Sequence, residues 1–181
     1  MGFFSKMFYT PPSKDKWSEI ALNISKSADD VAHLWFKEAV QKLKDNSLEI
    51  KNNELVGEGE LAIKAYLLFL SANFIASNEY IARSDGKDFA DILFAYICGN
   101  QIEEVLEFFG RYVDADGGEL IARFSGDVSS HILEEKSAFA VLFLGPSTIK
   151  LGLMIDVYIA KYFGDESTSN LMHQKLQNFS M

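Results

Sequence analysis

Residues 61–76 read LAIKAYLLFLSANFIA, and this run decides the fold class because apolar side chains occupy most sides of a helix drawn through it. A second run, TIKLGLMIDVYIA at residues 148–160, has the same character. A helix that is apolar on all sides has to be buried. The first run is too short, and too interrupted by Lys64 and Asn73, for a membrane span of about 20 mostly apolar residues. We therefore expect both runs to be central helices of a water-soluble protein.

The rest of the chain also follows the helical period, and no stretch alternates convincingly with the period of two that indicates a strand. Proline occurs only three times in 181 residues, so helix breakers are rare. A first helix is predicted from Ser13, as its N-cap, to Asn46. One face of this helix should lie in the core, because an apolar stripe follows it through Trp17, Ile20, Ile24, Ala28, Val31, Trp35, Ala39 and Leu43.

Glycine, proline and polar clusters divide the remaining sequence into further helices. Asn100 with Glu103 three residues later predicts an N-cap and its reciprocal capping partner. Residues 114–118 read DADGG and predict a turn. The helix after this turn can continue with a bend until Gly145 and Pro146 interrupt it. The predicted helices cover about 60–83, 87–98, 100–113, 119–135 with a continuation through 138–144, 147–163, and a last segment that carries Leu171, Met172, Leu176 and Phe179.

These elements predict an all-α fold, a single globular array of six to eight helices around two largely apolar central helices. One domain should cover residues 13–181, after an N-terminal segment at 1–12. In that segment Phe3, Phe4, Met7 and Phe8 can form a short amphipathic helix that lies on a membrane or a partner. Packing onto the chain's own domain, or fraying, is the plainer reading of the same residues.

The chain is acidic, with a formal net charge of −9. Nucleic acids bind surfaces rich in Lys and Arg, so a nucleic-acid partner is not expected. The charge suits a basic protein partner, although acidity also serves solubility alone. The single cysteine, Cys98, excludes an internal disulfide and predicts a reducing, cytoplasmic location. Because Cys98 ends an apolar run, we expect a buried structural thiol.

The most interesting polar set is Asp127, His131 and Glu135, spaced by four residues and therefore stacked along one side of the predicted helix. A histidine between carboxylates on a half-buried face can act as a general base or bind a metal. The structural alternative is a histidine with satisfied hydrogen bonds at the edge of the core. No second helix offers a complementary ligand pair, and the common hydrolase, nucleotide and zinc-protease motifs are missing from the sequence. We therefore predict no cofactor and no metal.

Each of the two apolar runs contains a charged residue at its middle, Lys64 in the first and Asp156 in the second. An unpaired buried ion costs several kcal/mol, on the order of the net stability of a domain. We expect each charge to find an opposite charge or to reach the surface. A direct ion pair between Lys64 and Asp156 is the simplest arrangement.

Three functional readings follow from these observations. The first is a non-enzymatic helical protein of bacterial type that acts through protein–protein binding, as an immunity, adaptor or regulatory factor, with a basic partner or as a homodimer. The second is an enzyme or metal-binding protein that uses the Asp127, His131 and Glu135 set. The third is membrane insertion, with two apolar arms that open around a turn at Gly145 and Pro146, although a soluble core hairpin explains the same residues.

Overall fold

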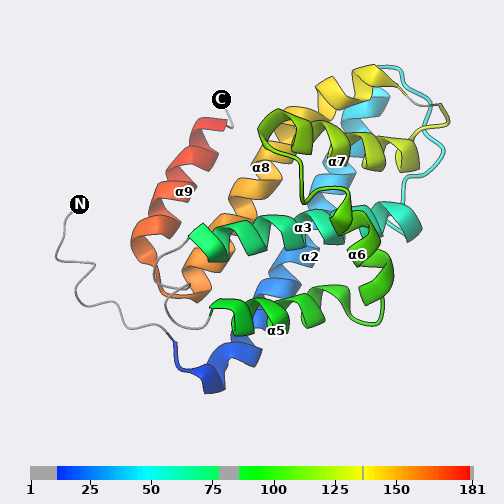
Figure 1. Ribbon diagram of the computed structural model, residues 1–181. Helices are drawn as coiled ribbons and strands as arrows, with labels where there is room; N and C mark the ends of the chain where they lie inside the picture. Colours follow the sequence, from blue (N-terminus) through cyan, green and yellow to red (C-terminus); the bar gives the residue numbers. More distant parts are fainter. Residues whose placement is uncertain (1–11, 78–85, 136, 180–181) are drawn as a thin grey trace.

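The computed structural model describes residues 12–77, 86–135 and 137–179, and this part of the chain is all-α. It is 82% helical, with seven helices and no strands in those ranges. The predicted fold class and number of helices are therefore confirmed. After a short 3-10 turn at Lys14–Lys16, the helices in Figure 1 are α2 (Trp17–Asp45), α3 (Gly57–Ser77), α5 (Gly86–Cys98), α6 (Ile102–Gly110), α7 (Gly117–Ile132), α8 (Ala138–Tyr162) and α9 (Glu166–Phe179).

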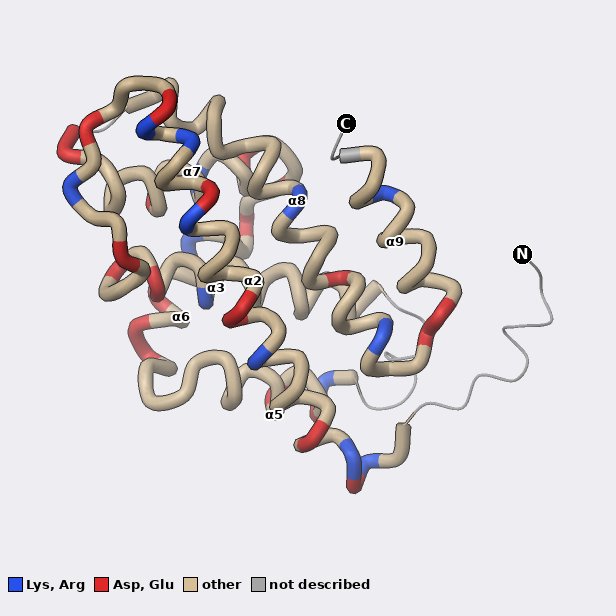
Figure 2. Tube along the Cα trace, turned by 180° about the vertical axis from the view of Figure 1, so that it is seen from behind, with Lys and Arg blue, Asp and Glu red and all other residues tan. Residues whose placement is uncertain are grey.

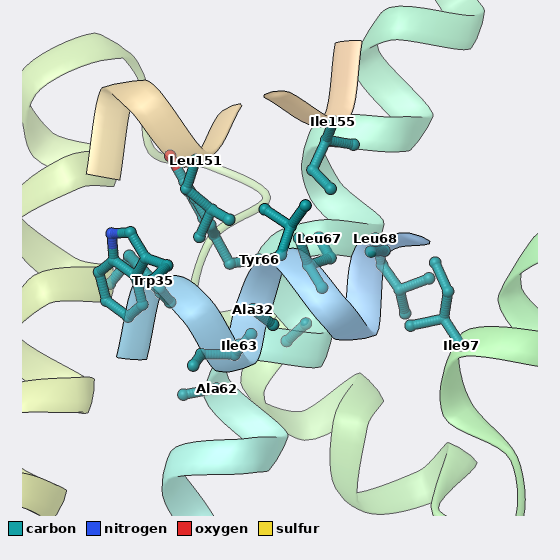
Figure 3. Packing of buried hydrophobic residues seen from close by; sticks show 14 of the residues in the cluster. Ala32, Trp35, Ala62, Ile63, Tyr66, Leu67, Leu68, Ile97, Leu151 and Ile155 are labelled. Carbon is teal, nitrogen blue, oxygen red and sulfur yellow. The ribbon is translucent and has the colours of Figure 1, made fainter. Parts of the chain in front are cut away.

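The two most apolar runs lie in α3 and α8, which pack against each other and together contact all the other helices of the described ranges. Helix α3 is covered by α5, α6, α7 and α8, whereas α8 is covered by α2, α7 and α9. Figure 3 shows Leu151 and Ile155 of α8 beside Tyr66 and Leu67 of α3, with Trp35 of α2 close by. The apolar faces of three helices thus meet in one core.

Helix α2 lies antiparallel to α8 along the core. Near its start, the Ser27 hydroxyl lies 3.3 Å from the Tyr162 hydroxyl at the end of α8. Further along, Glu38 forms an ion pair of 3.8 Å with Lys150. All eight residues of the predicted α2 stripe are buried, as the helical period requires.

Helix α7 ends at Ile132, three residues before the predicted end at 135. The backbone N–H groups of Lys51 and Asn52 both donate to the carbonyl oxygen of Ile132, at 2.8 and 3.1 Å. Leu133 is extended and forms an isolated bridge with Ile50. The connection between α2 and α3 therefore supplies the partners for the end of α7, and the helix does not continue.

Gly145 and Pro146 do not interrupt the helix as the sequence suggested, because α8 is one helix from Ala138 to Tyr162. Pro146 cannot donate a hydrogen bond to the carbonyl of Leu142, but both residues are exposed and water can replace that donor. The hydroxyls of Ser147 and Thr148 donate to the Leu144 carbonyl, each at 3.0 Å. The predicted interruption of the helix at Gly145 and Pro146 is therefore wrong.

The capping pair predicted from Asn100 and Glu103 is also wrong. The N-cap of α6 is Gln101, and no side-chain hydrogen bond caps the helix. The Gln101 amide oxygen instead accepts a hydrogen bond of 2.7 Å from the Lys64 ammonium of α3. Gly99 follows the last residue of α5, Cys98, and ends that helix with a left-handed φ of 58°.

Candidate functional site

The three residues of the predicted polar set do not share one helical face. Asp127 and His131 lie in α7, but Glu135 lies beyond the end of α7 and is exposed. The backbone turns extended at Leu133, which breaks the spacing of four on which the stacking depended. The prediction of a continuous Asp127, His131 and Glu135 row is therefore wrong at its third member.

The His131 side chain contacts the connection that precedes α3 and the first turn of α3. Its Nε2 atom lies 3.2 Å from the carbonyl oxygen of Glu54, and its ring lies 6.3 Å from that of Phe36. The ring also lies against Gly59, where a Cβ atom would be only 2.4 Å from His131 Cδ2. These contacts fit the structural reading of His131, a satisfied side chain at the edge of the core.

The Asp127 side chain joins α7 to the turn after α6. Its carboxylate accepts a hydrogen bond of 2.9 Å from the Tyr112 hydroxyl and lies 3.5 Å from the Arg111 guanidinium. Burial, with the Asp127 charge second, raises the pKa of Tyr112 well above its ordinary value. The Arg111 guanidinium lies over the Phe108 ring at 4.1 Å. Asp127 is thus held by two partners that position it structurally.

A shallow depression lies between α7 and the start of α8, and Asp127 lines it whereas His131 does not. Several of its polar side chains already have partners. The Arg123 guanidinium donates to Asp114 and Glu119 at 2.7 and 2.6 Å, and the Ser130 hydroxyl donates to the Gly126 carbonyl. No group of three metal-binding side chains occurs among the described residues. Arg123, Asp127 and Ser130 in the depression are therefore engaged in contacts within the fold.

The two mid-helix charges have separate neighbours. The Lys64 ammonium pairs with Glu60 at 2.5 Å, one turn earlier in α3. Within the described ranges no ion pair joins Lys64 to Asp156, so the simplest predicted arrangement is not the one observed. Burial raises the pKa of Asp156 to about 7, against a smaller lowering by Lys175 of α9. Burial raises the pKa of Tyr66, and the negative charge of Asp156 raises it further.

Two apolar surfaces remain outside the core. We define the α6 face as Ile102 and Leu106, which are 46% and 44% exposed, with the exposed carboxylates of Glu103 and Glu107 beside them. We define the α8 stripe as four exposed residues in the first half of α8, namely Phe139, Leu142, Pro146 and Ile149. Exposed apolar residues gathered on one face mark interaction surfaces more often than isolated ones do.

Sequence reasoning missed both surfaces, for different reasons. Residues 102–107 read IEEVLE, in which Ile102 and Leu106 lie one helical turn apart, as do Glu103 and Glu107. This spacing could have identified the α6 face from the sequence. The α8 stripe had no such signal, because a helix that is apolar all round does not reveal which side its neighbours leave open.

By length and composition alone, α3 and α8 could each cross a membrane. In α3, 56% of the apolar 18-residue stretch that could cross a membrane is buried within the fold, which is the pattern of a core helix. The corresponding value for α8 is 33%. Helix α8 is therefore the one whose apolar surface the described fold leaves largely uncovered.

The predicted docking residues Phe3, Phe4, Met7 and Phe8 lie outside the described residues. Comparison with known protein families, with curated proteins and with solved structures finds no match.

Proposed function

We propose that this protein is non-enzymatic and acts by binding a basic partner protein through the α6 face. The observation that carries the proposal is the pairing of two rows on one short helix. Ile102 and Leu106 form an apolar row, and Glu103 and Glu107 form a row of carboxylates beside it, each with members one turn apart. A partner that offers apolar side chains beside Lys or Arg residues matches both rows at once.

The charge on the α6 face is largely uncompensated. Glu107 has a distant ion pair of 3.7 Å with Arg111. Glu103 and Glu104 have no ion pair anywhere in the described ranges. Figure 2 shows the acidic positions of α6 with no basic position among them. With a net charge of −9 on the chain, a basic partner is attracted and acidic ones are repelled.

Aromatic side chains extend the apolar surface behind α6. Phe109 of α6 lies 6.3 Å from Phe69 of α3 and 6.0 Å from Phe94 of α5, measured between ring centroids. All three rings are half-buried. A partner side chain seated beside Leu106 therefore has a supporting aromatic surface from three helices, as the centre of a protein interface requires.

The experiment places a photo-crosslinking side chain at Leu106 in cells that make the protein. The matched control carries the same side chain at Leu34 of α2, which is also exposed. We expect a specific adduct with a basic protein at position 106 and none at position 34. The same adducts at both positions, or an acidic partner, would contradict the proposal.

A second step uses the partner identified in this way. The double substitution E103Q/E107Q removes two charges without changing side-chain size, so it should weaken binding about tenfold or more at low salt and less at high salt. Leu106→Ala should weaken binding at both salt concentrations. If neither variant binds more weakly than the parent, the α6 face is not the binding surface.

The enzyme alternative has less support than partner binding. It needs a second polar group beside His131 in a concave site. The half-buried His131 ring instead lies against Gly59, the Glu54 carbonyl and Phe36.

A further inference from the structure

We propose that the α8 stripe is a self-association surface, on which a second copy of this chain packs its own α8 stripe antiparallel about a two-fold axis. This proposal is independent of the one for the α6 face, because it concerns a different helix and a different partner.

The α8 stripe is the most exposed apolar surface in the described part of the chain. Phe139 and Leu142 are 67% and 69% exposed, and they lie almost one turn apart. Pro146 and Ile149 continue the row along the same side of the helix, since each residue turns about 100°. Removing large apolar side chains of this kind from water favours association.

The same side of α8 is covered further along the helix. Ala160 falls on the side of the stripe and is fully buried, while α9 packs along the second half of α8. Figure 1 shows α9 beside that half, with the start of α8 projecting beyond it. The second half of this side is therefore covered by a helix, and the first half lacks a cover among the described residues.

The spacing of the α8 stripe fits a second copy. Its residues at 139, 142, 146 and 149 are separated by three, four and three positions, so the stripe reads the same in both directions. In an antiparallel pair of helices related by a two-fold axis, residue i of one copy meets residue j of the other, and j meets i. With the axis at position 144, Phe139 meets Ile149 and Leu142 meets Pro146, twice each.

The lack of charge favours a second copy over a basic protein or an anionic lipid surface. Residues 137–149 contain no ionisable side chain, in a chain with a net charge of −9. Two copies can therefore meet here without placing carboxylates face to face. The nearest base in α8, Lys150, is paired with Glu38. Figure 2 shows the first half of α8 free of charge, so neither a basic protein nor an anionic lipid surface gains electrostatic attraction at the stripe.

Sedimentation equilibrium of the full chain over a range of concentrations tests the proposal. The apparent mass should rise from 20.3 kDa towards twice that value as concentration increases. Leu142→Glu should keep the protein monomeric, because two buried carboxylates would face the partner. The control is Leu171→Glu in α9, which is also an exposed leucine and should dimerise like the parent. A monomer at every concentration, or a dimer unaffected by Leu142→Glu, would overturn the proposal.

Disulfide trapping tests the register. A chain with Phe139→Cys mixed with a chain with Ile149→Cys should cross-link on mild oxidation, while the native Cys98 stays protected by burial. Two copies of the Phe139→Cys chain should not cross-link, because residues 139 are separated by about 15 Å along the helix axis in the proposed pair. Preferential cross-linking of Phe139→Cys with itself would indicate a parallel pair and overturn the register.

Two further measurements separate self-association from its competitors. In a flotation assay with phosphatidylcholine vesicles, the protein should remain unbound. If the parent were monomeric and bound the vesicles, and Leu142→Glu abolished that binding, the α8 stripe would be a membrane-binding surface instead. The variant E103Q/E107Q should dimerise normally. A dimer lost in that variant but kept in Leu142→Glu would place the self-association on the α6 face.

Discussion

Gly59 has no room for a side chain, because the His131 ring occupies the position of a Cβ atom. Gly59→Ala should lower the free energy of unfolding by about 1–3 kcal/mol, since either the ring or α3 has to move. Gly126→Ala is the matched control: a Cβ atom added at this helical glycine would meet no side chain within 4 Å, so alanine should stabilise the protein by about 0.5–1 kcal/mol. Urea denaturation of both variants measures the difference, and equal effects would contradict the close contact.

The same contact can be tested by a double-mutant cycle. In a His131→Ala background the Gly59→Ala substitution should cost little, because the atom that it meets has been removed. A cost that persists in this background would locate the strain in the backbone of α3.

Asp156 is a carboxyl whose burial raises its pKa to about 7. A raised pKa means that the folded protein binds this proton more tightly than the unfolded chain, so the contribution of Asp156 to stability falls as the pH rises from about 4 to about 7 and stays low above that. Asp156→Asn keeps the shape without the charge. It should raise the free energy of unfolding by roughly 1–3 kcal/mol at pH 8 and change it little near pH 4.

Urea midpoints of the parent and of Asp156→Asn at several pH values provide the measurement. Asp91→Asn on the exposed side of α5 is the control, because it removes one negative charge without removing a buried one. If Asp156→Asn destabilised the protein at pH 8, the carboxylate would have a stabilising partner and its burial would not be a cost.

Helix α8 runs through Pro146 although proline in a helix interior costs about 3 kcal/mol. Pro146→Ala restores a backbone N–H that can donate to the Leu142 carbonyl, so it should raise the free energy of unfolding by about 1–3 kcal/mol. The measurement is made in the Leu142→Glu background, where self-association does not contribute. A loss of stability would indicate that the chain turns at Gly145 and Pro146.

The helices of this protein were predictable from the sequence to the extent that their neighbours are local. The α2 stripe follows from helical period alone, and all its residues are buried. The end of α7 was not predictable, because Ile132 is capped by Lys51 and Asn52, which are far away in the sequence. Pro146 misled for a similar reason, since its tolerance depends on which side of α8 faces solvent.

The candidate site was less predictable than the helices. Spacing correctly put Asp127 and His131 on one helix, but their partners Tyr112, Arg111 and Glu54 come from other segments. The α8 stripe depends on where α9 ends its coverage, which is a property of tertiary packing. Sequence periodicity identifies which helices are apolar, whereas only their arrangement identifies the apolar side that remains open.

On the scale of the whole molecule, α9 is the helix that is least integrated into the core. It packs mainly against α8, and none of its described side chains is buried. Asp156 interacts electrostatically with Lys175 of α9 and with Tyr66 of α3, so α9 lies near a carboxyl whose burial raises its pKa to about 7. Ionisation of Asp156 should therefore favour the opening of α9, because an exposed carboxylate is hydrated and a covered one is not.

Amide hydrogen exchange followed by mass spectrometry can measure this opening. After correction for the intrinsic exchange rate, amides of α9 should be less protected at pH 8 than at pH 6, and in both conditions less protected than those of α3. Asp156→Asn should remove the difference between the two pH values in α9, because the ionising group is gone. Amides of α5, which lies away from α9, provide the internal control and should show equal protection at both. A pH dependence in α9 that survives Asp156→Asn would mean that another group governs its attachment to α8.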